Sequence, residues 1–115
     1  MSATHITVSH GSDFLGVDVI PVRQLREFGQ HVRGILPAAD YPPLTELLDA
    51  AGESEHAIGS DQAALLAVLL RRAASHRRLK KAYREVASRL GIAAANAAAD
   101  PEPWTWTPTT EGTRR

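Results

Sequence analysis

Large apolar side chains are scarce in this chain of 115 residues, and that scarcity limits what it can fold into. Leu, Ile, Val and Phe together number 26, whereas Ala alone numbers 19. The share of the four large residues is a little above the roughly 20% below which chains tend to be disordered. A chain of this length normally forms one domain. We therefore expect one folded unit with a thin core.

The first twenty residues predict a β-hairpin. Residues 6–10 alternate apolar and polar side chains, and residues 17–20 form a second short run that is typical of a strand. Gly11 and Gly16 bracket the segment between the two runs, as expected of a turn.

Apolar residues at helical spacing dominate the rest of the chain. They predict helices over residues 22–36, 44–51 and 79–90, and a further helix from Ser60 or Asp61 to a turn near Ser75. Residues 53–59 are predicted to form a polar loop, Gly91 is placed to end a helix, and the Ala-rich residues 92–99 predict one more short helix. The expected fold is α+β and mostly helical: an N-terminal β-hairpin followed by a compact bundle of three to five short helices.

The composition changes after Asp100-Pro101. We expect a globular domain over residues 1–103 and a C-terminal tail over 104–115 with a disordered end. Trp104 and Trp106 share parity, so an extended segment would present both on one face. Either they dock on the chain's own hairpin or helices, or they anchor the tail in a pocket of a partner. Self-docking is favoured because exposed paired tryptophans are costly and small domains need the burial.

The charges sum to zero but are segregated along the chain. Residues 40–61 hold six acids and no Lys or Arg, whereas residues 71–89 hold eight bases against only Glu85. A helix would place Arg77 and Lys81 opposite the apolar stripe, on a face that could hold phosphates or an acidic partner. The predicted binding residues are Arg71, Arg72, Arg77, Arg78, Lys80, Lys81 and Arg84. The alternative is a solvated face that the protein's own acidic segment neutralises in part.

Three segments together resemble a family of small uncharacterised proteins of actinobacteria and their phages. They read Ile-Thr-Val-Ser-His-Gly-Ser-Asp-Phe-Leu-Gly at residues 6–16, Leu-Arg-Arg-Ala-Ala-Ser-His-Arg-Arg at 70–78, and Glu-Pro-Trp-Thr-Trp at 102–106. The resemblance spans about residues 4–106. It implies a context of mobile or host-defence genes and no particular chemistry.

Residues 83–92 resemble the first helix and turn of a helix-turn-helix, with Leu-Gly-Ile at residues 90–92 as the corner. With the following helix the resemblance covers residues 83–99, and it implies that this second helix enters the major groove of DNA. The only polar side chain it offers there before Asp100 is Asn96, which is a poor basis for reading a sequence.

Catalytic and metal chemistry find little support in the sequence. The chain has no cysteine, which excludes thiolate ligands and nucleophiles, and it has no His-Glu-x-x-His pair. No glycine motif for a phosphate or dinucleotide is present, so we expect no cofactor and no metal. A small hydrolase or metal enzyme around His10 and Asp13 is the weakest hypothesis.

The best-supported function is a small non-enzymatic interaction module, an adaptor or regulator, whose basic helix face binds a protein or a nucleic acid. A helix-turn-helix regulator is the alternative. No apolar run is long enough to cross a membrane and no signal peptide is recognisable, so we expect a cytoplasmic protein. An open edge strand and a Leu-rich third helix also favour a homodimer.

Overall fold

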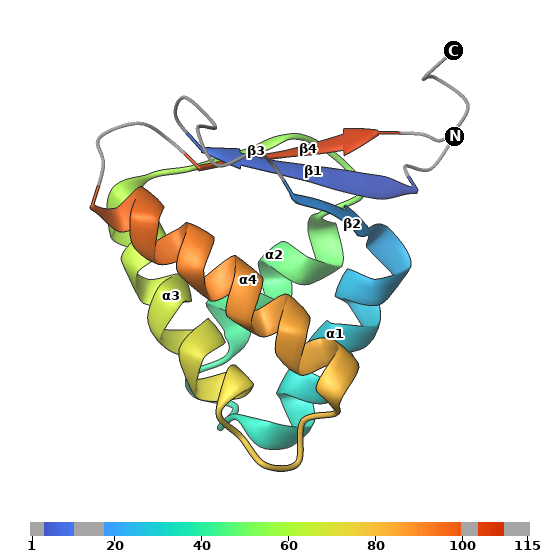
Figure 1. The fold of residues 1–115 in the computed structure, drawn as a ribbon, viewed down its shortest axis with the longest axis vertical. Helices are drawn as coiled ribbons and strands as arrows, with labels where there is room; N and C mark the ends of the chain where they lie inside the picture. The colour runs from blue at the N-terminus through green and yellow to red at the C-terminus, as the bar shows by residue number, and fades with distance from the viewer. Residues whose placement is uncertain (1–3, 11–17, 100–103, 110–115) are drawn as a thin grey trace.

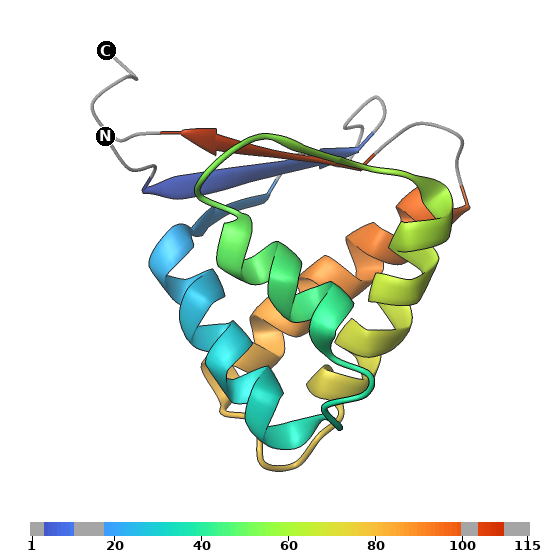
Figure 2. The same cartoon turned by 180° about the vertical axis from the view of Figure 1, so that it is seen from behind.

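A four-stranded antiparallel sheet and a layer of four helices make up the structure, a computed structural model that describes residues 4–10, 18–99 and 104–109. All four helices lie on the same side of the sheet (Figures 1 and 2). The elements in chain order are β1 (His5–His10), β2 (Asp18–Pro21), α1 (Val22–Ile35), α2 (Pro42–Ala50), β3 (His56–Ile58), α3 (Ser60–Ala74), α4 (Lys81–Ala98) and β4 (Trp104–Thr109). The predicted α+β class with an N-terminal hairpin is confirmed.

The last strand of the chain lies inside the sheet, whose order is β2-β1-β4-β3. β1 pairs with β2, as predicted, and with β4 on its other side, where Val8 stands opposite Trp106. β3 pairs with the far side of β4, with Ile58 opposite Trp104. The fold therefore extends to Thr109 instead of ending at residue 103. The sequence predicts a disordered end over residues 108–115, which is wrong for Pro108 and Thr109 because both pair with β1, while residues 110–115 fall outside the described part of the chain.

Both tryptophans of β4 point into the core. Trp104 and Trp106 are fully buried, whereas Thr105 and Thr107 between and after them are only half-buried. The two indoles meet edge to face, with ring centroids 5.4 Å apart. Self-docking is thus the correct interpretation, and a role as partner anchors is wrong because neither ring is accessible.

Strand β3 lies in the segment that the sequence predicted to be a polar loop, residues 53–59. Its three residues are too few for an alternating pattern to be recognised. Ile58 supplies its one buried apolar side chain, and the Nε2 of His56 donates a hydrogen bond to the carbonyl oxygen of Ala50, 3.2 Å away. The pairing with β4 defines this strand, and that pairing is not visible in the local sequence.

Helix α4 runs without a break through Gly91, so the predicted helix end at Gly91 and the separate helix over 92–99 are both wrong. Its buried face continues at helical spacing from Leu90 to Ala94 and Ala97. Gly91 faces α3 closely: a Cβ atom added there would lie 3.5 Å from the Cβ of Leu70. The glycine therefore serves helix packing and does not cap a helix.

Replacing Trp106 tests how much the core depends on β4. Trp106→Ala should lower the free energy of unfolding by about 3–5 kcal/mol, because it leaves a large cavity between sheet and helices. Trp106→Phe should cost clearly less, since it refills most of that space and removes an indole N–H that has no hydrogen-bond partner in the described part of the chain. Urea denaturation measures both, and an alanine variant as stable as the parent would contradict the placement of β4.

Gly91→Ala tests the continuous helix. The added methyl group fits at ordinary contact distance from Leu70, so the gain in helix propensity should raise the free energy of unfolding by up to about 1 kcal/mol. Gly52→Ala is the control, because its Cβ atom would stand only 3.0 Å from Cγ1 of Val22 and should destabilise the protein. Thermal unfolding distinguishes the two. Destabilisation by Gly91→Ala would favour a turn at this position.

Candidate functional site: the basic α3–α4 corner

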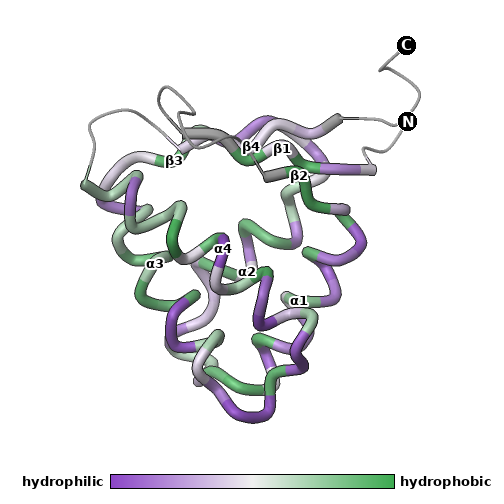
Figure 3. Tube along the Cα trace, in the orientation of Figure 1, coloured by the Kyte–Doolittle hydropathy of each residue, from purple (hydrophilic) through white to green (hydrophobic). Residues whose placement is uncertain are grey.

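The predicted basic residues gather where α3 ends and α4 begins, at the end of the helical layer furthest from the sheet (Figure 1). The chain is strongly hydrophilic at this end (Figure 3). All seven are exposed, and we call them the basic corner: Arg71, Arg72, Arg77, Arg78, Lys80, Lys81 and Arg84. Because α4 starts only at Lys81, Arg77 lies in a loop and not on a helix as predicted. A loop and two helix ends, rather than one helical face, present the charges.

The loop between the two helices is folded onto itself. The backbone N–H of Leu79 donates to the carbonyl oxygen of His76 (3.1 Å), and the N–H of Arg78 donates to Nδ1 of His76 (3.2 Å). The side chain of Leu79 is buried in the core. These contacts anchor the loop at its centre and leave Arg77 and Lys80 exposed on either side.

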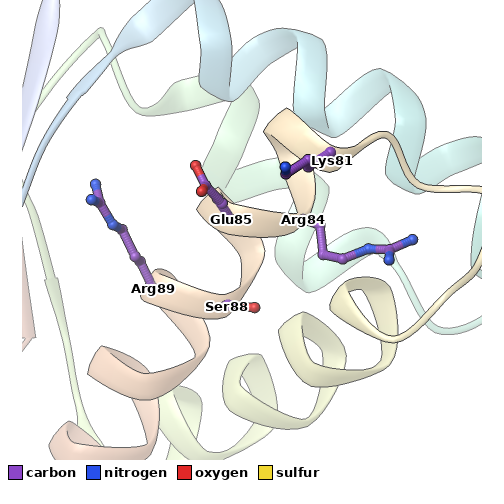
Figure 4. Close-up of a pocket in the computed structure, with 5 residues that line it drawn as sticks. All are labelled: Lys81, Arg84, Glu85, Ser88 and Arg89. Atoms are coloured by element: carbon purple, nitrogen blue, oxygen red, sulfur yellow. The ribbon is translucent and has the colours of Figure 1, made fainter.

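Arg84 positions this loop from α4. Its Nη2 donates hydrogen bonds to the carbonyl oxygens of His76 (3.2 Å) and Leu79 (3.1 Å), and its side chain reaches from the helix toward the loop (Figure 4). The sequence pattern marked Arg84 as one more phosphate-binding cation. In the structure two of its donors hold the loop that carries Arg77 and Arg78.

The acidic segment neutralises little of the basic corner. Arg72 forms an ion pair with Asp40, with Nη1 and Oδ2 3.3 Å apart. Asp49 instead pairs with Arg33 of α1, and Glu55 accepts a hydrogen bond from Thr107. Five cations of the corner have no acidic partner among the residues that the structure describes: Arg71, Arg77, Arg78, Lys80 and Lys81. The alternative interpretation, in which the protein's own acidic segment neutralises the cations, thus holds for Arg72.

Tyr83 fastens the first turns of α4 to α1. Its ring stacks near Phe28, with centroids 6.4 Å apart, and meets His31 edge on. The phenol donates a hydrogen bond to Oε1 of Glu27 (3.0 Å), and this bond raises the pKa of Tyr83 above its ordinary value of 10.0. The basic corner is therefore carried by a helix that is tied to the rest of the layer.

The hollows near the corner are surface grooves. One, of about 630 Å³, is lined by Lys81, Arg84, Glu85, Ser88 and Arg89, all from α4 (Figure 4). Another, of about 290 Å³, runs between α3 and α4 and is lined largely by small residues. No fully buried polar side chain lines either of them. Both grooves are open to solvent, whereas a ligand pocket encloses most of its ligand.

The structure contradicts the helix-turn-helix hypothesis and leaves the enzyme hypothesis untested. The described ranges contain no group of three or more side chains that could hold a metal ion. The side chain of His10 and all of Asp13 lie outside the described residues, so the hypothesis of an enzyme there stays untested. The helix-turn-helix interpretation is wrong because α4 continues through residues 90–92 without a corner. Asn96 is exposed on this same helix, and among the described residues no second helix follows to read DNA.

Arg84→Lys tests whether Arg84 holds the loop in place or only contributes a positive charge to the basic corner. The ammonium keeps the charge but sits on a shorter side chain and lacks the planar fork of the guanidinium group. It should therefore hold the two carbonyl oxygens less well, and the amide of Leu79 should exchange its hydrogen faster. The free energy of unfolding should change by only about 1 kcal/mol, because one of the two bonds is exposed and the other is only part-buried. Hydrogen exchange measured by NMR is the test, with Arg71→Lys as the control that leaves the loop untouched. Equal protection of Leu79 in both variants would contradict the assigned role.

No helix in the described part of the chain combines the length and the apolar character needed to cross a membrane.

Comparison with curated proteins and with solved structures finds no match. A family model described as "Domain of unknown function (DUF7739)" matches residues 11–107, which include every helix and most of the sheet. The chain therefore belongs to the DUF7739 family of uncharacterised domains.

Proposed function

We propose that this protein is a cytoplasmic, non-enzymatic interaction module, an adaptor or regulator, that binds a polyanionic macromolecule through the basic corner. One observation carries the proposal: five exposed cations without an acidic partner among the described residues surround a loop that the rest of the fold holds in shape. The held loop presents these cations together, which supports a role in binding.

Local charge matters more here than the net charge of zero. Five unpaired cations within eleven residues of sequence create a positive potential that attracts phosphates or carboxylates. The positive end of the α4 dipole adds to it, since α4 begins at Lys81. Arg84 and Leu79 hold the loop before a partner arrives, which reduces the entropy lost on binding.

Phosphate contact without base reading is the form of binding that fits a nucleic acid partner. The exposed residues on the second half of α4 are Ile92 and Asn96, and only Asn96 could hydrogen-bond a base edge. The corner itself holds Arg and Lys side chains, which make contacts to the phosphate backbone that do not depend on sequence. We therefore propose no sequence-specific recognition of DNA.

Binding to labelled duplex DNA, measured by anisotropy over a salt series, tests the proposal. Each phosphate contact contributes a slope of about −0.9 to the logarithm of affinity against the logarithm of salt. The double variant Arg77→Gln with Arg78→Gln should weaken binding and make the slope shallower by about two. The matched control replaces Arg23 and Arg26, two exposed arginines at the sheet end of α1, and should leave the slope unchanged.

The outcomes separate the two partner classes. Equal loss of binding in both double variants would contradict a specific role of the corner, and loss of binding in Asn96→Ala would contradict phosphate-only contact. Absence of binding at low salt would exclude nucleic acid and leave an acidic protein surface as the partner. In that case a pull-down should capture the partner with the parent chain and the Arg23/Arg26 control but not with the Arg77/Arg78 variant.

A further inference from the structure

The outer side of α3 leaves two large apolar side chains in solvent. Leu65 is 46% exposed and Val68 is 53% exposed, although Leu66, Leu69 and Leu70 of the same helix are buried. Residues three apart lie on one face of a helix, so Leu65 and Val68 form a single apolar spot. α3 stands at the outer edge of the helical layer in both views, and no other helix or strand of the described residues covers its outward side (Figures 1 and 2).

Opposite charges flank this apolar spot at equal spacing. Asp61 precedes Leu65 by four residues, and Arg72 follows Val68 by four. Positions i, i+4, i+7 and i+11 form one line along a helix, which we call the α3 stripe: Asp61, Leu65, Val68 and Arg72. The stripe reads acid, apolar, apolar, base, and its midpoint lies between residues 66 and 67.

Both charged residues of the α3 stripe, Asp61 and Arg72, can form a further ion pair. Asp61 is exposed and has no ion-pair partner among the described residues. Arg72 contacts Asp40 through Nη1 only. A guanidinium group carries five N–H donors in a planar fork, so Arg72 can hold Asp40 and accept a second carboxylate as neighbour.

We propose that the α3 stripe is the interface of a symmetric homodimer in which two α3 helices pack antiparallel. A two-fold axis through the midpoint places Leu65 against the partner's Val68 and Asp61 beside the partner's Arg72. Each contact then occurs twice, as in an isologous interface. A parallel arrangement would place Asp61 beside the partner's Asp61, so the charges select the antiparallel one.

A second copy fits this surface because the surface is complementary to itself. Arg72 is the one residue of the basic corner that belongs to the stripe. The five unpaired cations that carry the proposed function, such as Arg77 and Lys81, do not take part, so the dimer does not depend on that function. Ile92 of the adjacent helix α4 is also exposed, but it lines the groove between α3 and α4 and is not part of the stripe. The competing dimer would pair the edge strands β2, where Val19 is 57% exposed.

Sedimentation velocity at increasing protein concentration tests the dimer. The parent chain should shift from monomer to dimer as its concentration rises. Asp61→Arg should remain monomeric, because the new cation would face the partner's Arg72. Glu53→Arg makes the same charge change at an exposed site off the stripe and should still dimerise. Val19→Lys should dimerise as well, since a lysine there blocks pairing of the β2 edges only.

Cysteine crosslinking tests the antiparallel register, and the parent chain has no cysteine to interfere. A mixture of Leu65→Cys and Val68→Cys chains should form a disulfide between unlike chains faster than either variant alone forms one between like chains. Both positions are exposed, so the fold should tolerate the changes, and circular dichroism checks this.

Four outcomes would overturn the proposal. They are a parent chain that is monomeric at every concentration, a dimer that survives Asp61→Arg, a dimer lost in Val19→Lys, and faster disulfide formation in Leu65→Cys alone than in the mixture. A monomeric parent chain would leave the stripe as a surface for a different protein.

Discussion

The insertion of β4 between β1 and β3 is the interaction on which the rest of the structure depends. It joins the N-terminal hairpin to β3 and completes the sheet against which all four helices pack. It also brings Trp104 and Trp106, the two largest side chains of the chain, into the interface between sheet and helices. In a chain with few large apolar residues, these two rings fill volume that alanines on the helices leave open. The central pairing of the sheet joins residues 5–10 to residues 104–109, so it is a contact between segments far apart in the sequence.

The same layering explains where a binding surface can arise. One end of the α3–α4 pair lies near the sheet, while the other end carries the basic corner in solvent (Figure 1). Tyr83 and Leu79 pack against the core, so they anchor the charged loop to the rest of the fold. Arg84 then shapes the loop from the side. A charged surface is thus held by apolar contacts, and the cations themselves remain available to a partner.

Local patterns allowed much of the fold to be predicted. The hairpin and the helices α1, α2 and α3 followed from alternation and helical spacing, and the basic residues were visible as a charge segment. The strand β3 could not be found, because three residues carry too little periodicity. Gly91 was misread because a glycine at a helix end and a glycine at a close helix contact look the same in sequence. The buried positions Ala94 and Ala97 were the signal for a continuous helix, although alanine is weak evidence of burial.

By itself the sequence determined which segments are helical or extended, the common face of Trp104 and Trp106, and the separation of acidic from basic residues. These properties depend on neighbours within a few positions, since backbone geometry sets the periods of 3.6 and 2. Only the tertiary structure decided the order of the strands. It also gave the arginines different roles, since Arg72 pairs with Asp40 and Arg84 supports a loop. It likewise decided that Leu65 stays in solvent while Leu66 is buried. Such outcomes depend on contacts between segments far apart in the chain, and local spacing does not encode them.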